Sequence, residues 1–351
     1  MRARLLASLA AAALATGGLA WGLRDHLPLP AGLLRGPAVG QADDLRIATW
    51  NIEWLMTPAA YEELWARCDP DGQPRSHERA LPCAPGREPP PRRQGADFDA
   101  LARIAESLDA DVVALQEVDG PAAARLVFRQ GWALDCFSRR AHPQKVGFAI
   151  RAGIPYRCHA ELSELDIDGA SRPGADVTLW PGTPRAVRIL GVHLKSGCPE
   201  GPLTRPDGRP TREPCAKLSR QVPILARWAQ AREREGVAYA IAGDFNRRLE
   251  QDARFDAGPD PQRPRNLLAG INALLPPQSP LLPATAGQAY TRCHGADRHK
   301  AWIDDVLLSS RLAARARSRD FQAHRYDDRQ ARERQLSDHC PISVELDGAV
   351  R

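Results

Sequence analysis

The chain has 351 residues, of which 43% are hydrophobic and 26% charged, and its formal net charge is +5. This composition belongs to an ordinary soluble globular protein, not to a disordered or fibrous chain, and it permits one large domain or two small ones. The small positive excess permits an anionic partner such as nucleic acid or a lipid headgroup but does not require one. Arg greatly outnumbers Lys, and this usage is also typical of a GC-rich genome.

The chain begins with a segment that has the features of an export signal. Arg2 and Arg4 precede an uncharged apolar run, Leu5–Leu23, which has small residues near its end. This pattern is typical of a secretory signal peptide, and the run is also long enough for an uncleaved anchor. A buried core helix would leave the flanking arginines unexplained. The sequence therefore predicts a signal peptide or signal anchor at 1–24, a linker at 25–44, and an extracytoplasmic body (periplasmic, secreted or anchored by the N-terminus) at 45–347.

Six short apolar runs in the body have the length of β-strands and are bounded by polar or turn residues. They are Leu45–Trp50, Val112–Leu115, Val146–Ile150, Ala186–His193, Val237–Ala242 and Trp302–Leu308. Between several of them lie helical patterns, such as Phe98–Leu108 and Leu218–Arg234. Many strands with fewer helices favour an α/β sandwich with functional residues at strand ends.

Long Pro-rich stretches interrupt this order at 69–95, 198–214 and 256–287. Strand motifs continue on both sides of each stretch. We therefore predict that the three stretches are surface insertions and not domain boundaries.

Six polar clusters stand at the ends of the apolar runs. They are Asn51-Ile52-Glu53, Gln116-Glu117, His193-Leu194-Lys195, Gly243-Asp244-Phe245-Asn246, Asp304-Asp305 and Ser337-Asp338-His339. A single polar residue after a strand is usually a turn former or a cap. Six clusters at strand ends, all containing Asp, Glu, Asn or His, instead indicate a functional site.

These clusters lie in elements that resemble the endonuclease/exonuclease/phosphatase (DNase I-like) superfamily. In the order of that family they read TWNIEWL, ALQEV, GVHLKSG, AGDFNRR, WIDDVLLSS and LSDHCPI. The resemblance covers residues 45 to 347, and the combination is specific although no single element is. It implies an α+β fold, a four-layer α/β-sandwich of two packed mixed β-sheets flanked by helices.

The resemblance also implies a site for a divalent metal. A phosphodiester is an anion, and attack on it builds negative charge that a hard divalent cation relieves. Asn51 and Glu117 match the metal positions of the family and offer an amide and a carboxylate oxygen, which suit Mg²⁺ or Mn²⁺. Asp338 matches a third position whose metal role varies among members.

The remaining matches carry acid–base roles. Asp244 matches the residue that orients or deprotonates the attacking water, and Asn246 would hold a phosphate oxygen or the nucleophile. His339 matches the histidine that donates to the scissile phosphate. Asp304 matches the carboxylate that orients this histidine and raises its basicity.

His193 matches a second histidine, found in the DNase I-like and sphingomyelinase-like branches of the family. In the former, that histidine pairs with a Glu, and the corresponding position falls at Gln144 here. An amide orients a ring but does not stabilise its charged form equally, so the match to a proton donor is imperfect. Lys195 is a weaker assignment; its ammonium group would point at the phosphate.

The chain contains eight cysteines. Behind an export signal, an even number predicts disulfides, and no pair has the CxxC spacing of a zinc site. The sequence alone does not determine connectivity, and sequential pairing is our prediction: Cys68–Cys83, Cys136–Cys158, Cys198–Cys215 and Cys293–Cys340.

Together these features predict an exported, divalent-metal-dependent phosphodiesterase, an endonuclease acting on DNA or RNA. Two alternatives stay open: a phosphodiesterase or phosphatase acting on a lipid headgroup such as sphingomyelin or a phosphoinositide, and a catalytically silent surface binding protein. Low Trp and Phe content in the insertions disfavours the first, and the filled catalytic positions disfavour the second. We expect a monomer with a nucleic acid substrate, no protein partner, and membrane contact only through an uncleaved N-terminal anchor.

Overall fold

The structure is a computed structural model that describes residues 44–68, 89–169, 171–258, 260, 262–295, 297 and 300–348. The predicted export segment 1–24, nearly all of the predicted linker and Cys83 lie outside the described residues. Within these ranges, no helix has both the length and the apolar character needed to cross a membrane.

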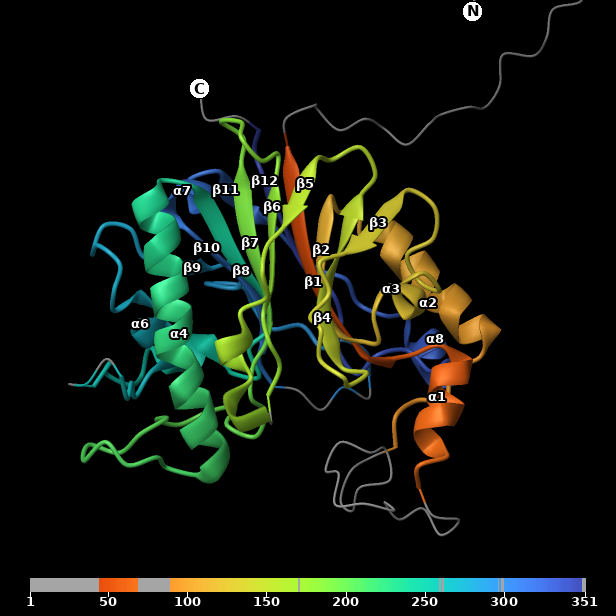
Figure 1. The fold of residues 1–351 in the computed structure, drawn as a ribbon, viewed down its shortest axis with the longest axis horizontal. Coiled ribbons are helices and arrows are strands. Elements are labelled where there is room, and N and C mark those ends of the chain that lie inside the picture. Colours follow the sequence, from red (N-terminus) through yellow and green to blue (C-terminus); the bar gives the residue numbers. More distant parts are fainter. Residues whose placement is uncertain are drawn as a thin grey trace, which may run out of the picture. The chain divides into compact units, whose positions relative to one another are not determined.

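Two mixed six-stranded sheets form the centre of the fold (Figure 1). The strand order in the first sheet is β11 (Ala316–Ala323), β12 (Ile342–Leu346), β1 (Leu45–Leu55), β2 (Val112–Val118), β4 (Lys145–Arg151) and β3 (Trp132–Asp135). The order in the second is β5 (Tyr156–Cys158), β6 (Ala175–Leu179), β7 (Val187–His193), β8 (Ala238–Asp244), β10 (Asp304–Leu308) and β9 (Leu282–Pro283). The pairs β1/β2 and β7/β8 are parallel, and the other neighbours are antiparallel.

Helices cover the outer faces of both sheets (Figure 1). Some of the helices lie next to strands of the first sheet in the sequence: α1 (Pro58–Trp65), α2 (Gly95–Ser107), α3 (Pro121–Ala124) and α8 (Asp328–Glu333). The others are α4 (Glu213–Glu235), α5 (Leu249–Asp252), α6 (Leu267–Asn272) and α7 (Ser310–Ala313), with two 3₁₀ turns, Ser163–Leu165 and Ile167–Gly169. Because α2 packs on β1 and β2, and α4 packs on β7 and β8, the predicted four-layer α/β-sandwich is confirmed.

The burial of β1 on both faces explains why its sequence is almost continuously apolar. Leu45 and Ile47 lie in the core between the two sheets, whereas Trp50 and Ile52 lie in the core beneath α2. Successive side chains of a strand point to opposite faces, so a strand covered on both sides needs apolar residues at nearly every position.

Each predicted strand is present with shifted bounds, and the two predicted helices are longer than expected. Several edge strands were not predicted because they are short or polar: β11, for example, reads ARSRDFQA. The prediction of a surface insertion is wrong for part of 256–287. Leu267 and Ile271 of α6 are buried in the same core as α4, so this segment completes a helical layer.

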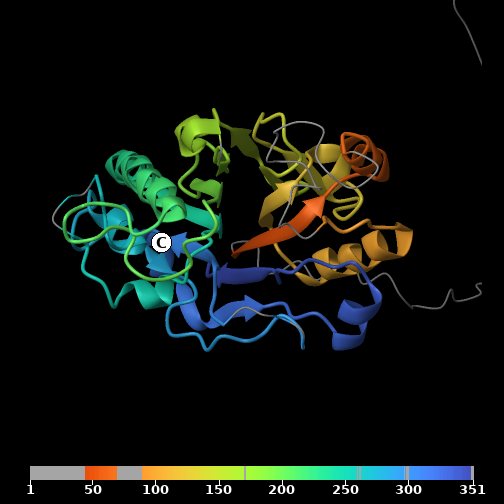
Figure 2. The same ribbon diagram turned by 90° about the horizontal axis from the view of Figure 1, so that it is seen from below.

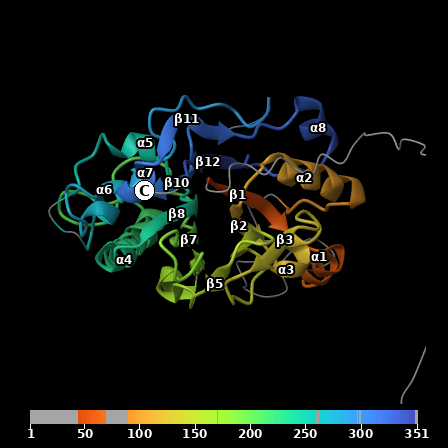
Figure 3. The same cartoon turned by 90° about the horizontal axis from the view of Figure 1, so that it is seen from above.

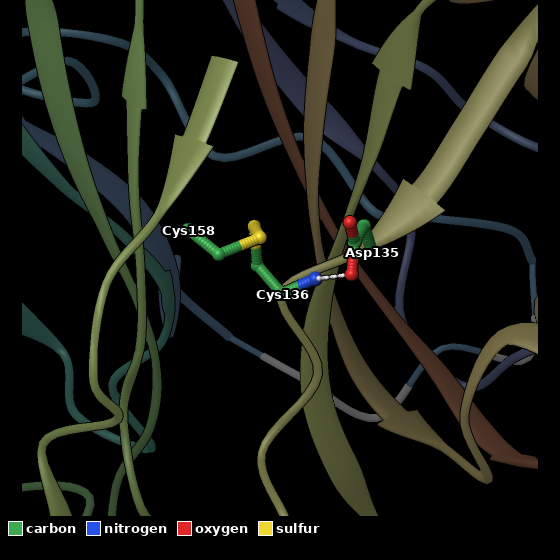
Figure 4. Close-up of side chains that lie close together, drawn as sticks. All are labelled: Asp135, Cys136 and Cys158. Atoms are coloured by element: carbon green, nitrogen blue, oxygen red, sulfur yellow. Dashed lines mark hydrogen bonds between the residues drawn. A yellow bond between two sulfur atoms is a disulfide. The ribbon is translucent and has the colours of Figure 1, made fainter.

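Three predicted disulfides are confirmed, Cys136–Cys158, Cys198–Cys215 and Cys293–Cys340. The predicted fourth pair requires Cys83, which is outside the described residues. Figure 4 shows that Cys136, directly after β3, reaches Cys158 at the end of β5, so this disulfide joins the edge strands of the two sheets. Asp135 beside it accepts the backbone N–H of Cys136 at 2.7 Å. Both sulfurs are consumed in the disulfide, so the group is not a metal site.

Candidate active site

The strand directions bring the predicted site residues to one pole of the sandwich, which Figure 2 views from below. The parallel pairs β1/β2 and β7/β8 end at this pole, and the antiparallel β10 begins there. Asp244, the last residue of β8, therefore stands in register between His193 on β7 and Asp304 on β10.

Gly243 allows β7 and β8 to approach closely just before His193 and Asp244. A Cβ atom at this position would lie 1.9 Å from the carbonyl oxygen of Val192, inside any allowed contact distance. Only glycine fits such a close approach of two backbones. The position of the Asp244 carboxylate beside His193 therefore depends on a residue that has no side chain.

Asp244 is the centre of the polar network. It is buried, and its carboxylate accepts hydrogen bonds from the Asn51 amide at 3.1 Å and from the Asn246 backbone N–H at 2.7 Å. The Asn246 amide donates a further bond at 3.0 Å. Asn246 has φ +51°, a left-handed conformation that is sparsely populated and persists where surrounding contacts enforce it. Asn51 comes from the first sheet, so these bonds join the two sheets.

His339 forms an acid–base pair with Asp304. Its Nδ1 lies 2.7 Å from Asp304 Oδ2, and its Nε2 lies 3.9 Å from both Asp244 Oδ2 and Asp338 Oδ1. Burial opposes a charge on this ring, but the carboxylates of Asp304, Asp244 and Asp338 outweigh burial and hold the pKa of His339 well above its usual value. His339 is therefore an imidazolium with one N–H directed toward the site.

Burial and the negative charge of Asp304 raise the pKa of Asp244 to about 7, although His339 and the hydrogen bonds from Asn246 and Asn51 act in the opposite direction. A carboxylate with this pKa is a stronger base than an ordinary Asp and is still ionised in an appreciable fraction at neutral pH. Such matching of pKa to working pH is what general-base chemistry needs.

His193 has the opposite protonation preference to His339. Its Nε2 lies 3.4 Å from Asp244 Oδ2 and 3.7 Å from Glu117 Oε1, yet burial first, and then the positive charges of Arg172 and His339, hold its pKa well below the usual value. His193 is therefore neutral, and its contacts with the carboxylates are not ion pairs.

The expected pairing of Gln144 with His193 is wrong. The Gln144 amide oxygen instead accepts a hydrogen bond from Arg172 at 2.7 Å. Within the part of the chain that the structure describes, His193 Nδ1 is buried without a hydrogen-bond partner. The guanidinium competes successfully for the amide oxygen because a charge-assisted hydrogen bond is stronger than a neutral one.

Asn51 and Glu117 lie at the adjoining ends of β1 and β2. The Asn51 amide oxygen accepts the Glu53 N–H at 3.0 Å, and Glu117 Oε2 accepts the Trp54 N–H at 3.2 Å. Glu117 has φ +58°, a strained conformation for a side chain of this size. Each oxygen retains lone pairs, so a carboxylate and an amide oxygen fit a hard divalent cation.

A tighter cluster of ionisable atoms consists of Asp244, Asp304 and His339, within 4.8 Å of one another. Within this cluster, Nδ1 of His339 is already paired with Asp304 Oδ2 at 2.7 Å, whereas Glu117 and Asn51 offer the hard oxygen ligands that Mg²⁺ and Mn²⁺ prefer. The chemistry of the donor set therefore favours Glu117 and Asn51 as ligands.

The predicted metal residue Asp338 is exposed, and its backbone N–H donates to Glu53 Oε2 at 3.1 Å. Glu53 was not singled out from the sequence, although it stands in the same motif as Asn51. Burial, followed by the negative charge of Asp338, raises the pKa of Glu53 to about 7. The two carboxyl groups of Glu53 and Asp338 are thus close together, between β1 and the loop that carries Asp338.

Two arginines near the site were also missed. Arg93 is buried and donates to the carbonyl oxygens of Glu53 at 2.7 Å and Leu336 at 2.8 Å, which ties the end of β1 to the loop before Asp338. Arg172 lies 4.0 Å from Glu117. Arg93 stands in a Pro-rich stretch and Arg172 in a loop, so neither lies beside an apolar strand or in one of the family motifs by which the other site residues were found.

The comparisons with known proteins agree with this fold. Residues 48–339 match the model of the Endonuclease/Exonuclease/phosphatase family. The chain therefore belongs to the endonuclease/exonuclease/phosphatase family, as the sequence resemblance predicted. A search of curated protein sequences found no match.

Solved structures share the fold at low sequence identity. A truncated TDP2 from Caenorhabditis elegans is 16% identical, with 87% of this chain and 98% of that chain covered and a TM-score of 0.50. An AP endonuclease from Archaeoglobus fulgidus is 14% identical, with 86% and 99% covered and a TM-score of 0.50. A variant of the 3′ phosphatase NExo from Neisseria, bound to a product DNA hairpin, is 17% identical, with 86% and 99% covered and a TM-score of 0.50. At these identities the likeness concerns the fold.

Proposed function

We propose that this chain is a divalent-metal-dependent phosphodiesterase, and specifically an endonuclease that hydrolyses DNA or RNA outside the cytoplasm. The observation that carries the proposal is the pairing of an imidazolium, His339, with a carboxylate of pKa about 7, Asp244, at 3.9 Å. Hydrolysis of a phosphodiester needs a base that acts on the attacking water and a donor that stabilises the negative charge on phosphate, and this pair supplies both.

In the proposed reaction, Asp244 accepts a proton from the attacking water, which Asn246 helps to hold. His339 donates a hydrogen bond to the scissile phosphate, and Asp304 fixes the orientation of its ring through the 2.7 Å contact. Mg²⁺ or Mn²⁺, held by Asn51 and Glu117, would offset the charge that develops on phosphate. His193 Nε2 lies 3.4 Å from Asp244 Oδ2 and 3.7 Å from Glu117 Oε1; because this ring is neutral, the leaving oxygen takes its proton from water in the proposed reaction.

Two features support the finer parts of the proposal. Disulfides form and persist in oxidising compartments, and three are present, which supports a location outside the cytoplasm. Besides burial, the positive charges of Arg172, Arg140 and Lys195 all lower the pKa of His193, so these cations are near enough to the site to act on a polyanionic substrate.

The test is a parallel assay of the purified protein in Mg²⁺ with supercoiled plasmid, RNA, sphingomyelin and a chromogenic phosphodiester. We expect nicked and then linear plasmid, or cleaved RNA. Turnover of sphingomyelin alone would refute the choice of substrate but retain the catalytic assignment. No hydrolysis of any of these esters would refute the whole proposal.

A further inference from the structure

A second pocket lies at the pole opposite the active site, which Figure 3 views from above. Leu45, Val187 and Ala238, at the starts of β1, β7 and β8, are in its lining. A strand of seven residues separates the two poles by about 20 Å. The cavity volume is about 510 Å³, within the range of small-molecule sites.

One wall of this pocket combines an aromatic ring with a cation. Trp180 and Arg185 both line it, and the Arg185 guanidinium lies 4.7 Å from the centre of the Trp180 ring. This cation–π contact holds the guanidinium at the pocket wall. The half-buried indole also adds apolar surface beside Val187 and Leu45.

Two further arginines line the pocket, Arg311 in α7 and Arg315 just after it. The Nε of Arg315 donates to the Asp347 carbonyl at 2.6 Å, which fixes the direction of the side chain. Within the described ranges, the terminal nitrogens of Arg315 and the whole Arg311 guanidinium have no acceptor.

Positive charge is concentrated here at an energetic cost. Burial, and then the charge of Arg185, lower the pKa of Arg315, while the carboxylates of Asp44 and Asp347 compensate only in part. Neither carboxylate lines the pocket. An anion between the guanidiniums would relieve the repulsion, and a phosphate group matches the forked donors of arginine.

We propose that this pocket is a second anion site, which binds the phosphate group of an organic ligand whose apolar part rests against the half-buried Trp180 indole. Two sources share this chemistry, the headgroup of an anionic phospholipid and a soluble organic phosphate such as a mononucleotide. The site is separate from the catalytic pole, and its existence does not depend on the function proposed above.

The test measures binding to the full chain in EDTA, with three probes: inorganic phosphate, a mononucleotide, and vesicles of phosphatidylglycerol in phosphatidylcholine. The variant Arg311→Gln/Arg315→Gln should bind the accepted probe at least about tenfold more weakly than the wild type. The matched control Arg103→Gln/Arg254→Gln removes the same charge from two exposed positions elsewhere and should bind like the wild type.

Arg311→Gln alone changes an exposed side chain, so it keeps the test valid if the double variant unfolds. Loss of binding to the soluble probes would identify a soluble ligand, and loss of binding to the vesicles alone would identify a headgroup. The proposal is overturned if no probe binds the wild type, or if the arginine variants and the control bind equally well. Hydrolysis of a small phosphodiester at the opposite pole should be unchanged in all variants.

Discussion

At the scale of single residues, the site depends on two histidines that differ in charge although both are buried. Three carboxylates face His339, whereas Arg172 and His339 itself act on His193. The local surroundings, and not the residue type, therefore decide which ring carries a proton. Only the charged ring, oriented by Asp304, is suited to stabilise negative charge on phosphate.

This difference predicts unequal effects of substitution. Asp244→Asn and His339→Ala should each reduce the hydrolysis rate at least about a hundredfold, because acid–base groups contribute about 10²–10⁴. His193→Ala should cost less, since the neutral ring does not supply the proton. Asp244→Asn should melt near the wild type, whereas His339→Ala should melt at a lower temperature because it leaves the buried Asp304 carboxylate without its partner. A loss in His193→Ala as large as that in His339→Ala would contradict the assignment of roles.

The pKa of Asp244 should determine the pH below which the hydrolysis rate falls. A base must be ionised, and with a pKa of about 7 Asp244 is ionised above this pH and protonated below it. The rate in metal-saturated buffer should therefore fall as pH decreases below about 7, and not near the usual pKa of Asp. A rate that stays constant down to a pH of about 5 would show that another group is the base.

At the scale of secondary-structure elements, the approach of β7 and β8 depends on Gly243. Gly243→Ala should destabilise the protein by at least about 3 kcal/mol, because the added Cβ would lie 1.9 Å from the Val192 carbonyl and the strands must separate. Gly95→Ala is the matched control, since no atom lies within 4 Å of its Cβ position, and it should change stability by less than about 0.5 kcal/mol. Chemical unfolding measures both.

The disulfide Cys293–Cys340 ties a loop to the residue that follows His339. Replacing both cysteines with Ala should cost about 2–5 kcal/mol and also lower kcat, because the loop that carries His339 loses an anchor. The control is the same replacement of Cys136 and Cys158, which join edge strands away from the site. It should lower stability but leave kcat of the folded protein unchanged. Equal kcat values in the two variants would argue against a positioning role.

At the scale of the whole molecule, the two sheets each contribute one part of the site. Asn51 and Glu117 come from the first sheet, whereas His193 and Asp244 come from the second. The Asn51–Asp244 hydrogen bond crosses between the sheets. Packing of the sheets therefore assembles the site, and Asn51, Glu117 and Asp244 hold their positions only while the sheets stay together.

The proposed metal dependence follows from this assembly of residues from both sheets. EDTA should abolish hydrolysis of any accepted phosphodiester, and Mg²⁺ or Mn²⁺ should restore it. Glu117→Gln should require a much higher metal concentration while it remains folded, because a neutral amide binds a hard cation more weakly than a carboxylate does. Titration of activity against free metal measures this, and full activity in chelator would rule out the metal site.

The sequence by itself determined much of this protein. The apolar runs predicted the central strands because a strand buried on both faces must be apolar at nearly every position, as in β1. All residues predicted to be catalytic or to bind metal lie in the connected network around Asp244, whereas the ammonium group of Lys195, the weaker assignment, donates to the Ser196 carbonyl oxygen. Sequential cysteine pairing was also correct for the three described disulfides.

Only the tertiary structure decided how these residues behave. Gln144, at the position that pairs with the second histidine in relatives, accepts a hydrogen bond from Arg172 instead. Arg93 donates to the carbonyl oxygens of Glu53 and Leu336 and so connects Glu53 to the loop before Asp338. The charges of His339 and His193 likewise follow from neighbours far away in the sequence. Burial and distance between charges determine a pKa, and neither is encoded in a local motif, because both arise only when distant segments pack together.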